Sequence, residues 1–377
     1  MADTLYFSRD TKVYIAIGSD IWEVPVLDGF SFSQSTNTSE ITLNEMSDTS
    51  GNSRRGRQMF TDSYAPAEWS FSTYARPFAS AGSGDGKADT SAKHHAVEEV
   101  LWALMVGAAT YSSYSFTGFT ADTTDLDISF GSSNKTTLGT ADIYFVLGGA
   151  RSGTKTTYKI TGCCVNEASL DFDIDGIATI NWSGMGTLIN EDSAPTATVY
   201  EAVSSTSNFI RNRLTTLAMT TADDHLLATG ESADGDSDVE TYDLVLTGGN
   251  ITVSNNITFL TPETLGVVNQ PLGHVTGTRS VSGSFTCYLD QESGQTKSAD
   301  LFERIIEDTD TITNNFDLTF KIGGASATPR IELAMSDCHL EVPAHSIDDV
   351  ISLETNFHAL PSTIEQTDEL TIKYVGA

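Results

Sequence analysis

Basic residues are scarce in this chain. Its 377 residues include 20 Lys and Arg against 51 Asp and Glu, a formal net charge of −31. Phosphate contacts and anionic membranes both require clustered Lys and Arg, so the composition argues against nucleic-acid binding and against membrane docking. Hydrophobic residues still make up 39% of the sequence, too many for a disordered acidic chain. We therefore expect the charge on the surface of two to three folded domains.

Cysteine is also scarce, with four residues: Cys163, Cys164, Cys287 and Cys338. The adjacent pair fits neither a zinc knuckle nor an ordinary disulfide, so we expect buried thiols in a reducing cytoplasm. The first residues lack the basic and apolar regions of a signal peptide, and no apolar run reaches the length of a membrane span. The sequence predicts no membrane partner.

Motifs for catalysis or cofactor binding are missing. We find no GxSxG, HExxH, P-loop or GxGxxG in a suitable context, and therefore predict no catalytic residue, no cofactor and no metal. The segment 234–240 has DxDxD spacing but lacks the glycine and distal Glu of an EF-hand, so we interpret it as an acidic loop. His94 and His95 precede a predicted helix and are expected to be solvated there. A glycoside hydrolase needs only two carboxylates and stays the weakest alternative.

Most segments show the patterns typical of β-strands. Leu170 to Trp182 predicts a long hairpin that turns near Asp175 and Gly176. In 95–105, by contrast, Val97, Val100, Leu101 and Leu104 have helical spacing, and Gly107 follows as a stop. The first half is thus predicted to be a β domain with one short amphipathic helix. Its strands are expected near 13–17, 22–26, 30–33, 69–74 and 143–147.

The second half repeats this order of segments. A helix is again predicted once among strands, at 299–306, and 214–220 takes the place of 13–17. We interpret the order as a tandem duplication, with domains at 1–195 and 196–377 joined near 190–195. The matched segments are 249–254 with 29–33, 284–288 with 70–74, 316–320 with 126–130, and 347–353 with 174–180.

Three aspartates alternate with apolar residues at the end of one predicted strand. Alternation places Leu170, Phe172 and Ile174 on one face and Asp171, Asp173 and Asp175 on the other. Like charges on one strand face repel each other, so such a face borders much water or uses its negative field. An ordinary solvated strand face is the alternative interpretation.

Three arginines are concentrated in a long predicted loop, 44–66. Arg54, Arg55 and Arg57 lie within four positions, whereas the corresponding segment of the second half, 264–278, has no such cluster. In so acidic a chain, this patch indicates docking on an acidic surface of another copy. The alternative is a mobile loop whose arginines have no specific contact.

The order of a strand pair, an arginine-containing loop, the segment 66–77 (PAEWSFSTYARP), a helix and a closing hairpin resembles the tail tube (major tail) proteins of tailed bacteriophages. This resemblance implies a β-sandwich or partial barrel with a flanking helix. Six such folds close a ring, and their inner sheets join into a large β-barrel. Stacked rings make a hollow tube that holds DNA and the tape-measure protein, and the long loop reaches the neighbouring ring.

For this chain, the resemblance implies a stacking loop at 44–66 and an acidic lumen. The loop's expected contact residues are Arg54, Arg55, Arg57, Met59 and Phe60, and the expected lumen-facing acids are Asp171, Asp173 and Asp175. Two domains per chain predict a trimeric, pseudo-hexameric ring; the alternative is a true hexamer with the second copy outside. Inner strands are expected near 29–43, 67–76, 170–183, 249–260, 279–289 and 345–357.

The resemblance also implies partners and a location. The expected partners are other copies of the chain, DNA and tape-measure protein in the lumen without specific binding, baseplate and tail terminator proteins, and a sheath if the tail is contractile. The expected location is the virion tail, assembled in the cytoplasm of the bacterial host. The competing function is another virion protein, a decoration or adhesion β-protein, which would need an exposed aromatic groove or a clear ion site.

Overall fold

Strands dominate the computed structural model, which confirms the expected mainly β fold. One α-helix has both ends within the described residues, α1 (Glu99–Met105). The structure describes residues 6–41, 49–52, 57–80, 82, 89–107, 110–130, 138–149, 153, 155–196, 206–221, 240–290, 297–299, 301, 305, 316–324 and 329–376.

The first half forms two packed sheets that share one long strand, β14 (Thr156–Asp173). The early part of β14 pairs in one sheet and its late part in the other. Between the sheets, the rings of Phe32 and Phe145 stack with centroids 4.5 Å apart. One sheet runs β2 (Asp20–Val24), β1 (Thr11–Ile17), β13 (Ala141–Leu147), β14 and β16 (Leu188–Glu191). The other runs β3 (Ser31–Ser33), β6 (Ala67–Tyr74), β15 (Thr179–Gly186) and β14.

The second half has the same strand order in its own two sheets. Ser70 pairs with Ser183 between β6 and β15, and Ser284 pairs with Asn356 at the corresponding place in the second half. One sheet runs β18 (Glu240–Tyr242), β17 (Thr216–Thr221), β23 (Phe316–Ile322), β24 (Arg330–Leu340) and β27 (Thr371–Val375). The other runs β19 (Leu246–Ser254), β22 (Ser280–Tyr288), β26 (Ile351–Ala359) and β24, with β25 (Ala344–Ile347) beside β26.

One sequence match is wrong in the light of this pairing. The segment 316–320 was matched to 126–130, but β23 pairs with β17 and β24 as β13 pairs with β1 and β14. The true counterpart of β23 in this arrangement is therefore β13. The short strand β12 (Asp125–Ser129) instead pairs with β11 (Phe119–Ala121) and β27. β12 and β23 have a similar alternation of apolar and polar residues, so the sequence alone could not show which strand of the first half corresponds to β23.

The two halves join through strand pairing at two places. β14 pairs with β19 from Glu167–Ser254 to Asp173–Gly248, which makes one continuous sheet of β3, β6, β15, β14, β19, β22 and β26. β27, near the C-terminus, pairs with β24 on one side and with β12 of the first half on the other. A single apolar core runs through both halves. The predicted division at 195 remains a prediction.

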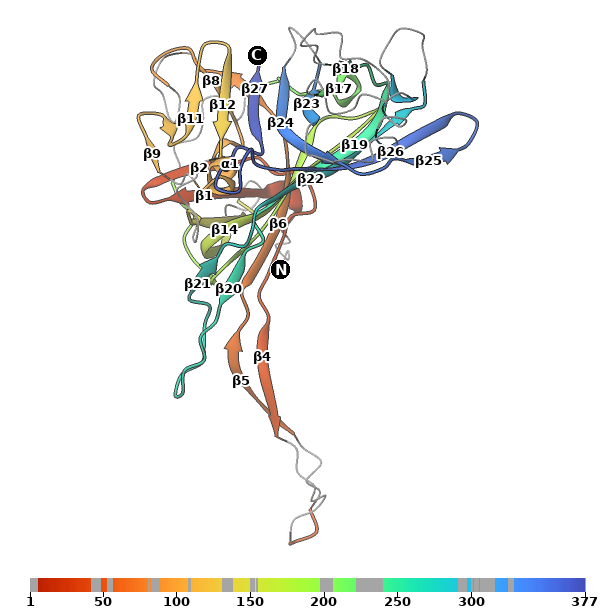
Figure 1. Ribbon diagram of the computed structural model, residues 1–377. Helices are drawn as coiled ribbons and strands as arrows, with labels where there is room; N and C mark the ends of the chain where they lie inside the picture. Colours follow the sequence, from red (N-terminus) through yellow and green to blue (C-terminus); the bar gives the residue numbers. More distant parts are fainter. Residues whose placement is uncertain are drawn as a thin grey trace.

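Several hairpins extend from these sheets (Figure 1). Two of them, β4 with β5 and β20 with β21, point away from the body in the same direction. The remaining elements are β4 (Thr36–Ile41), β5 (Gln58–Tyr64), β20 (Thr258–Leu260), β21 (Gly273–Val275), β7 (Pro77–Ala79), β8 (His94–Ala96), β9 (Tyr111–Ser112), β10 (Ser115–Phe116), η1 (Ser8–Asp10) and η2 (Asn212–Leu214).

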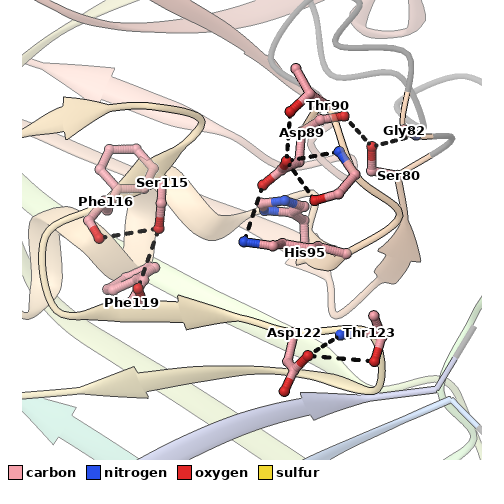
Figure 2. A network of polar contacts seen from close by, with 12 residues as sticks. Ser80, Gly82, Asp89, Thr90, His95, Ser115, Phe116, Phe119, Asp122 and Thr123 are labelled. Carbon is pink, nitrogen blue, oxygen red and sulfur yellow. Dashed lines mark hydrogen bonds and ion pairs between the residues drawn. The ribbon is translucent and has the colours of Figure 1, made fainter.

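The helix α1 is buried on all sides, although its sequence predicts an amphipathic helix with an exposed face. The prediction that His94 and His95 are solvated is also wrong, since both lie buried in β8. The physical reason is a charge partner inside the protein: His95 Nδ1 lies 2.9 Å from Glu99 Oε2. Burial alone would lower the pKa of His95, but Glu99 raises it overall. Figure 2 shows His95 below the turn at Asp89. In that turn, the backbone N–H of Ser91 donates a hydrogen bond to the Asp89 carboxylate.

Glu98 should make the stability of the protein depend on pH. Burial raises its pKa from 4.5 to about 7. The protonated carboxyl therefore stabilises the folded state fully below pH 4.5, and this stabilisation is lost as the pH rises through 7. A shift of this size corresponds to about 3 kcal/mol. Thermal unfolding of Glu98→Gln should match the wild type near pH 4 and show the higher Tm near pH 8.5. Melting curves of the two proteins that shift in parallel between these pH values would contradict this assignment.

Gly184 in β15 should tolerate no side chain. A Cβ at this position would overlap the carbonyl oxygen of Cys164 and the ring of Trp69, so the indole can lie against the sheet only because Gly184 has none. Gly184→Ala is expected to destabilise the protein by about 3 kcal/mol, measured by denaturant unfolding. Gly273→Ala is the matched control, since its Cβ would meet open space. Equal stability of the two variants would refute the packing argument.

The four cysteines are free and buried, as the sequence predicts. Burial raises the pKa of Cys164 to about 12 and that of Cys287 to about 11, so these thiols are protonated and unreactive at neutral pH. The predicted helix at 299–306 lies mostly outside the described residues, where positions 298, 299, 301 and 305 are helical. The acidic segment 234–239 lies wholly outside them. Within the described ranges, no helix is long and apolar enough to span a membrane.

Candidate functional site: a polar sheet face and two hairpin arms

The continuous sheet has one apolar face and one polar face. Along β15 and β26, buried and more exposed positions alternate, so every second side chain packs into the core. The other side chains form a surface that we call the polar face. Cross-strand pairing brings its residues into rows, and one row consists of Tyr74, Thr179, Asp171, Asn250, Ser284 and Asn356.

The polar face is built from hydroxyls, amides and carboxylates. Its strand segments are 31–33, 67–74, 167–173, 179–186, 246–254, 280–288 and 351–359, and none of them contains Lys or Arg. Their five acids are Glu68, Glu167, Asp171, Asp173 and Glu354. A surface with acids and without cations carries a negative field and offers no fixed contact to phosphate.

The structure brings together two of the three predicted aspartates. Asp171 and Asp173 are exposed on the polar face, and Asn181 donates a 3.2 Å hydrogen bond to Asp171 Oδ2. Asp175 lies in the turn after β14, where its carboxylate is 3.7 Å from Arg213. Ile174, expected on one strand face with Leu170 and Phe172, does not share their burial, because the strand ends at Asp173 and Ile174 begins the turn.

The strands of the polar face lie close to the inner strands that the sequence predicts, but among their side chains the sequence points only to the three aspartates. The serines and threonines that make up much of the surface come from all seven strand segments, in both halves. Ser70 and Ser72 alternate with buried residues in β6, and Ser282 and Ser284 flank the half-buried Gly283 in β22. This alternation of small hydroxyl residues is the signal that could have identified the face.

The predicted stacking loop, 44–66, is in part a strand. Its described end forms β5, which pairs with β4 in a hairpin that we call the first arm. Every residue of β4 is exposed, and Met59 and Phe60 of β5 are exposed by 56% and 54%. Arg57 Nη1 lies 3.4 Å from Glu40 Oε1 across the hairpin. Arg54 and Arg55 lie outside the described residues.

A second arm lies beside the first (Figure 1). It consists of β20, β21 and the loop between them, which carries exposed apolar side chains at Leu265, Val267, Val268 and Leu272. Asn269 in this loop holds the first arm: Tyr64 donates its N–H to the Asn269 carbonyl at 2.9 Å, and Asn269 donates to the Asp62 carbonyl at 3.1 Å. In the sequence, this segment differs from the first arm's loop only by its shorter length and its lack of an arginine cluster.

The two arms expose surface that an isolated domain would normally cover. A two-stranded hairpin is marginally stable alone in water, and contiguous exposed apolar side chains are typical of protein interfaces. The arms are therefore suited to docking on another protein surface. In the described part of the chain, by contrast, no group of three or more His, Cys, Asp or Glu residues is arranged to hold a metal ion.

Comparisons with known proteins agree with this geometry. A family model described as phage tail tube protein matches residues 75–359 of the chain. The tail tube protein pb6 of Escherichia phage T5 is 28% identical over 381 residues, which cover 97% of this chain and 75% of that protein. The matched region contains α1, the β14–β15 hairpin and most of the continuous sheet.

Proposed function

Because this chain belongs to the phage tail tube protein family, and so has a structural role in the tail tube, we propose that it forms stacked rings with the polar face toward the lumen. The observation that carries this proposal is the continuous sheet whose polar face contains five acids and no Lys or Arg. Such a lining repels phosphate and offers no cation to hold it. DNA and a tape-measure protein would then pass without specific binding, and catalysis would have no part in the function.

We propose further that three chains close one ring. The two halves share their strand order, and corresponding residues pair in the same register at Ser70–Ser183 and Ser284–Asn356. We call each half of the chain a module. The pairing of β14 with β19 joins the two modules of one chain, and the same pairing could join modules of neighbouring chains. Two modules from each of three chains give the six folds expected of a tube ring. A ring of six chains, with the second half outside, is the competing arrangement.

The arms are proposed to join one ring to the next. They point in one direction from the body, and their exposed residues include Met59, Phe60 and Leu265. Arg54 and Arg55 would add positive charge where one acidic ring meets another. The tube would lie in the virion tail after assembly in the host cytoplasm. Its further partners would be baseplate and terminator proteins, and a sheath in a contractile tail.

Negative-stain electron microscopy of the purified chain tests the proposed function. We expect rings or hollow tubes of uniform diameter, since one module's sheet edge is paired by the next and few edges stay open. The alternative, a decoration or adhesion protein, predicts isolated particles that do not form tubes. Isolated particles under conditions that favour assembly, namely high protein concentration and raised salt, would overturn the tube assignment.

A further inference from the structure

A short segment of the chain clasps the turn of the β14–β15 hairpin. This segment, 210–214, precedes the first strand of the second half and includes η2. Ala178 donates its N–H to the Ile210 carbonyl at 2.8 Å, and Asn212 donates to the Gly176 carbonyl at 3.2 Å. Ile177 and Arg211 are direct antiparallel bridge partners. The first strand of one module is thus preceded by a peptide that pairs with the hairpin of the module before it.

Side chains strengthen this contact. Ile210 is fully buried, although the turn that it contacts lies at the end of a hairpin. The guanidinium of Arg213 lies 3.7 Å from the Asp175 carboxylate. The intrachain clasp therefore combines three features: backbone pairing with the turn, one buried apolar side chain, and a cation above the turn's acid.

The N-terminal segment repeats the shape of the clasping segment, and Arg9 is the one residue that the two have in common at matching positions. η1 precedes β1 as η2 precedes β17, which makes Tyr6 the counterpart of Ile210, Phe7 of Arg211, and Arg9 of Arg213. Tyr6 and Phe7 are exposed by 43% and 50%, whereas Ile210 is fully buried. Tyr6 contacts Thr156 at the start of β14, and Ile210 lies correspondingly close to the start of β24.

The second hairpin turn repeats the clasped turn. By the sequence match, Asp348, Val350 and Ile351 correspond to Asp175, Ile177 and Ala178. Ile351 is 37% exposed and Val350 58%, whereas Ala178 is buried. Figure 1 shows the β25–β26 hairpin extending from the body, apart from the N-terminus of the same chain. The turn also carries two carboxylates, Asp348 and Asp349, where the clasped turn has Asp175 and Gly176.

We propose that the N-terminal segment 6–10 of one copy of this chain clasps the β25–β26 turn, 347–351, of a second copy. The inferred contacts are those of the intrachain clasp. Val350 pairs with Phe7, and Ile351 donates its N–H to the Tyr6 carbonyl. Arg9 faces Asp348 and Asp349 as Arg213 faces Asp175 within one chain, and this charge complementarity argues for a second copy of the chain as the occupant.

This inference rests on the proposed function, since it requires modules from successive chains to meet as the two modules of one chain do. It also adds a direction to assembly. The clasp joins the N-terminus of each chain to the last hairpin of its neighbour, which is a head-to-tail contact that closes when the rotation returns to the first chain. Each ring of three chains would contain three such clasps between chains and three within them.

Disulfide cross-linking tests the clasp. Antiparallel partners have Cα atoms about 4.5–5.5 Å apart, which lies within the range that a disulfide spans. Phe7→Cys with Val350→Cys should therefore give, after mild oxidation of assembled tubes, covalent dimers and trimers of the 40.4 kDa chain on a denaturing gel. Ser8→Cys with Asp349→Cys is a second pair one position along, at exposed sites where substitution leaves the core intact. Native thiols are buried and should not react.

Two controls make the outcome decisive. Ile177→Cys with Arg211→Cys should link within one chain and leave its mass unchanged, and Phe7→Cys alone should leave monomers. Tubes in which the control pair links while both interchain pairs stay monomeric would overturn the clasp and leave the tube assignment intact. An unmodified chain that stays monomeric under assembly conditions would overturn both.

Discussion

Arg54→Glu combined with Arg55→Glu is expected to give rings that fail to stack into tubes. The reason is the electrostatic repulsion between two strongly acidic rings. In the proposed ring, three chains of −31 would carry a formal charge of −93, so rings would repel one another unless cations lie at the contact. Of the 20 Lys and Arg residues in the chain, three lie in the predicted stacking loop, and the variant replaces two of them by acids.

Electron microscopy of the purified variant measures this effect as tube length. We expect separate rings or stacks of a few rings, with partial recovery at raised salt because ions screen the repulsion. Arg54→Lys with Arg55→Lys retains the charge and should form long tubes. Tubes of wild-type length from the glutamate variant at low salt would refute the docking role.

The apolar side chains of the first arm allow a separate test of the same contact. Met59→Ser with Phe60→Ser removes two exposed apolar groups and should shorten tubes without lowering the Tm of the chain, since neither side chain lies in the core. Ile364→Ser is the matched control, because Ile364 is 99% exposed and lies outside both arms. Equal tube lengths for the two variants would remove Met59 and Phe60 from the contact.

Local patterns of apolar residues predicted much of this fold. Alternation predicted strands close to β3 and β6, apolar runs predicted strands close to β1 and β13, and the turn between β14 and β15 was also predicted. These patterns could not predict that β14 is a single strand serving two sheets, since that depends on partners far away in the sequence. The burial of α1 was missed for a similar reason: Glu98 and Glu99 look like a solvated face until Arg76 and His95 are placed against them.

The candidate site was predicted in part. The alternation of Asp171 and Asp173 with buried residues was sufficient to place them on one exposed strand face. Asp175 followed the same pattern in the sequence, but the strand ends before it and Arg213 lies beside it. The second arm was missed because the segment 264–278 differs in sequence from the arginine loop only by its shorter length and the lack of a basic cluster, whereas the exposure of Leu265 and Leu272 depends on the fold.

Asp171→Lys combined with Asp173→Lys is expected to leave tube assembly intact and to slow DNA ejection several-fold. Both side chains are exposed on the polar face, so neither substitution disturbs the core. The seven strand segments of that face contain no other Lys or Arg, and stacked rings would repeat the new cations along the whole lumen. Each cation adds an attraction for phosphate, and many such contacts together retard sliding. Fluorescence of a DNA-binding dye outside triggered virions measures the rate.

Neutral variants separate the sign of the charge from the loss of the acids. Asp171→Ser with Asp173→Ser should eject DNA at close to the wild-type rate, because serine matches the rest of the face and binds no phosphate strongly. The slow ejection of the lysine variant should also ease as salt is raised. Ejection of the lysine variant at the wild-type rate in low salt would show that these positions do not face the DNA.

The central claim is that two similar modules in each chain build a ring around a polar lumen. Electron microscopic reconstruction of assembled tubes, without imposed rotational symmetry, measures the number of chains in each ring and the face that lines the channel. The account predicts three chains, six similar modules, and the polar face with Asp171 and Asp173 turned inward. A ring of six chains with the second half outside, or a lumen lined by another surface, would contradict it.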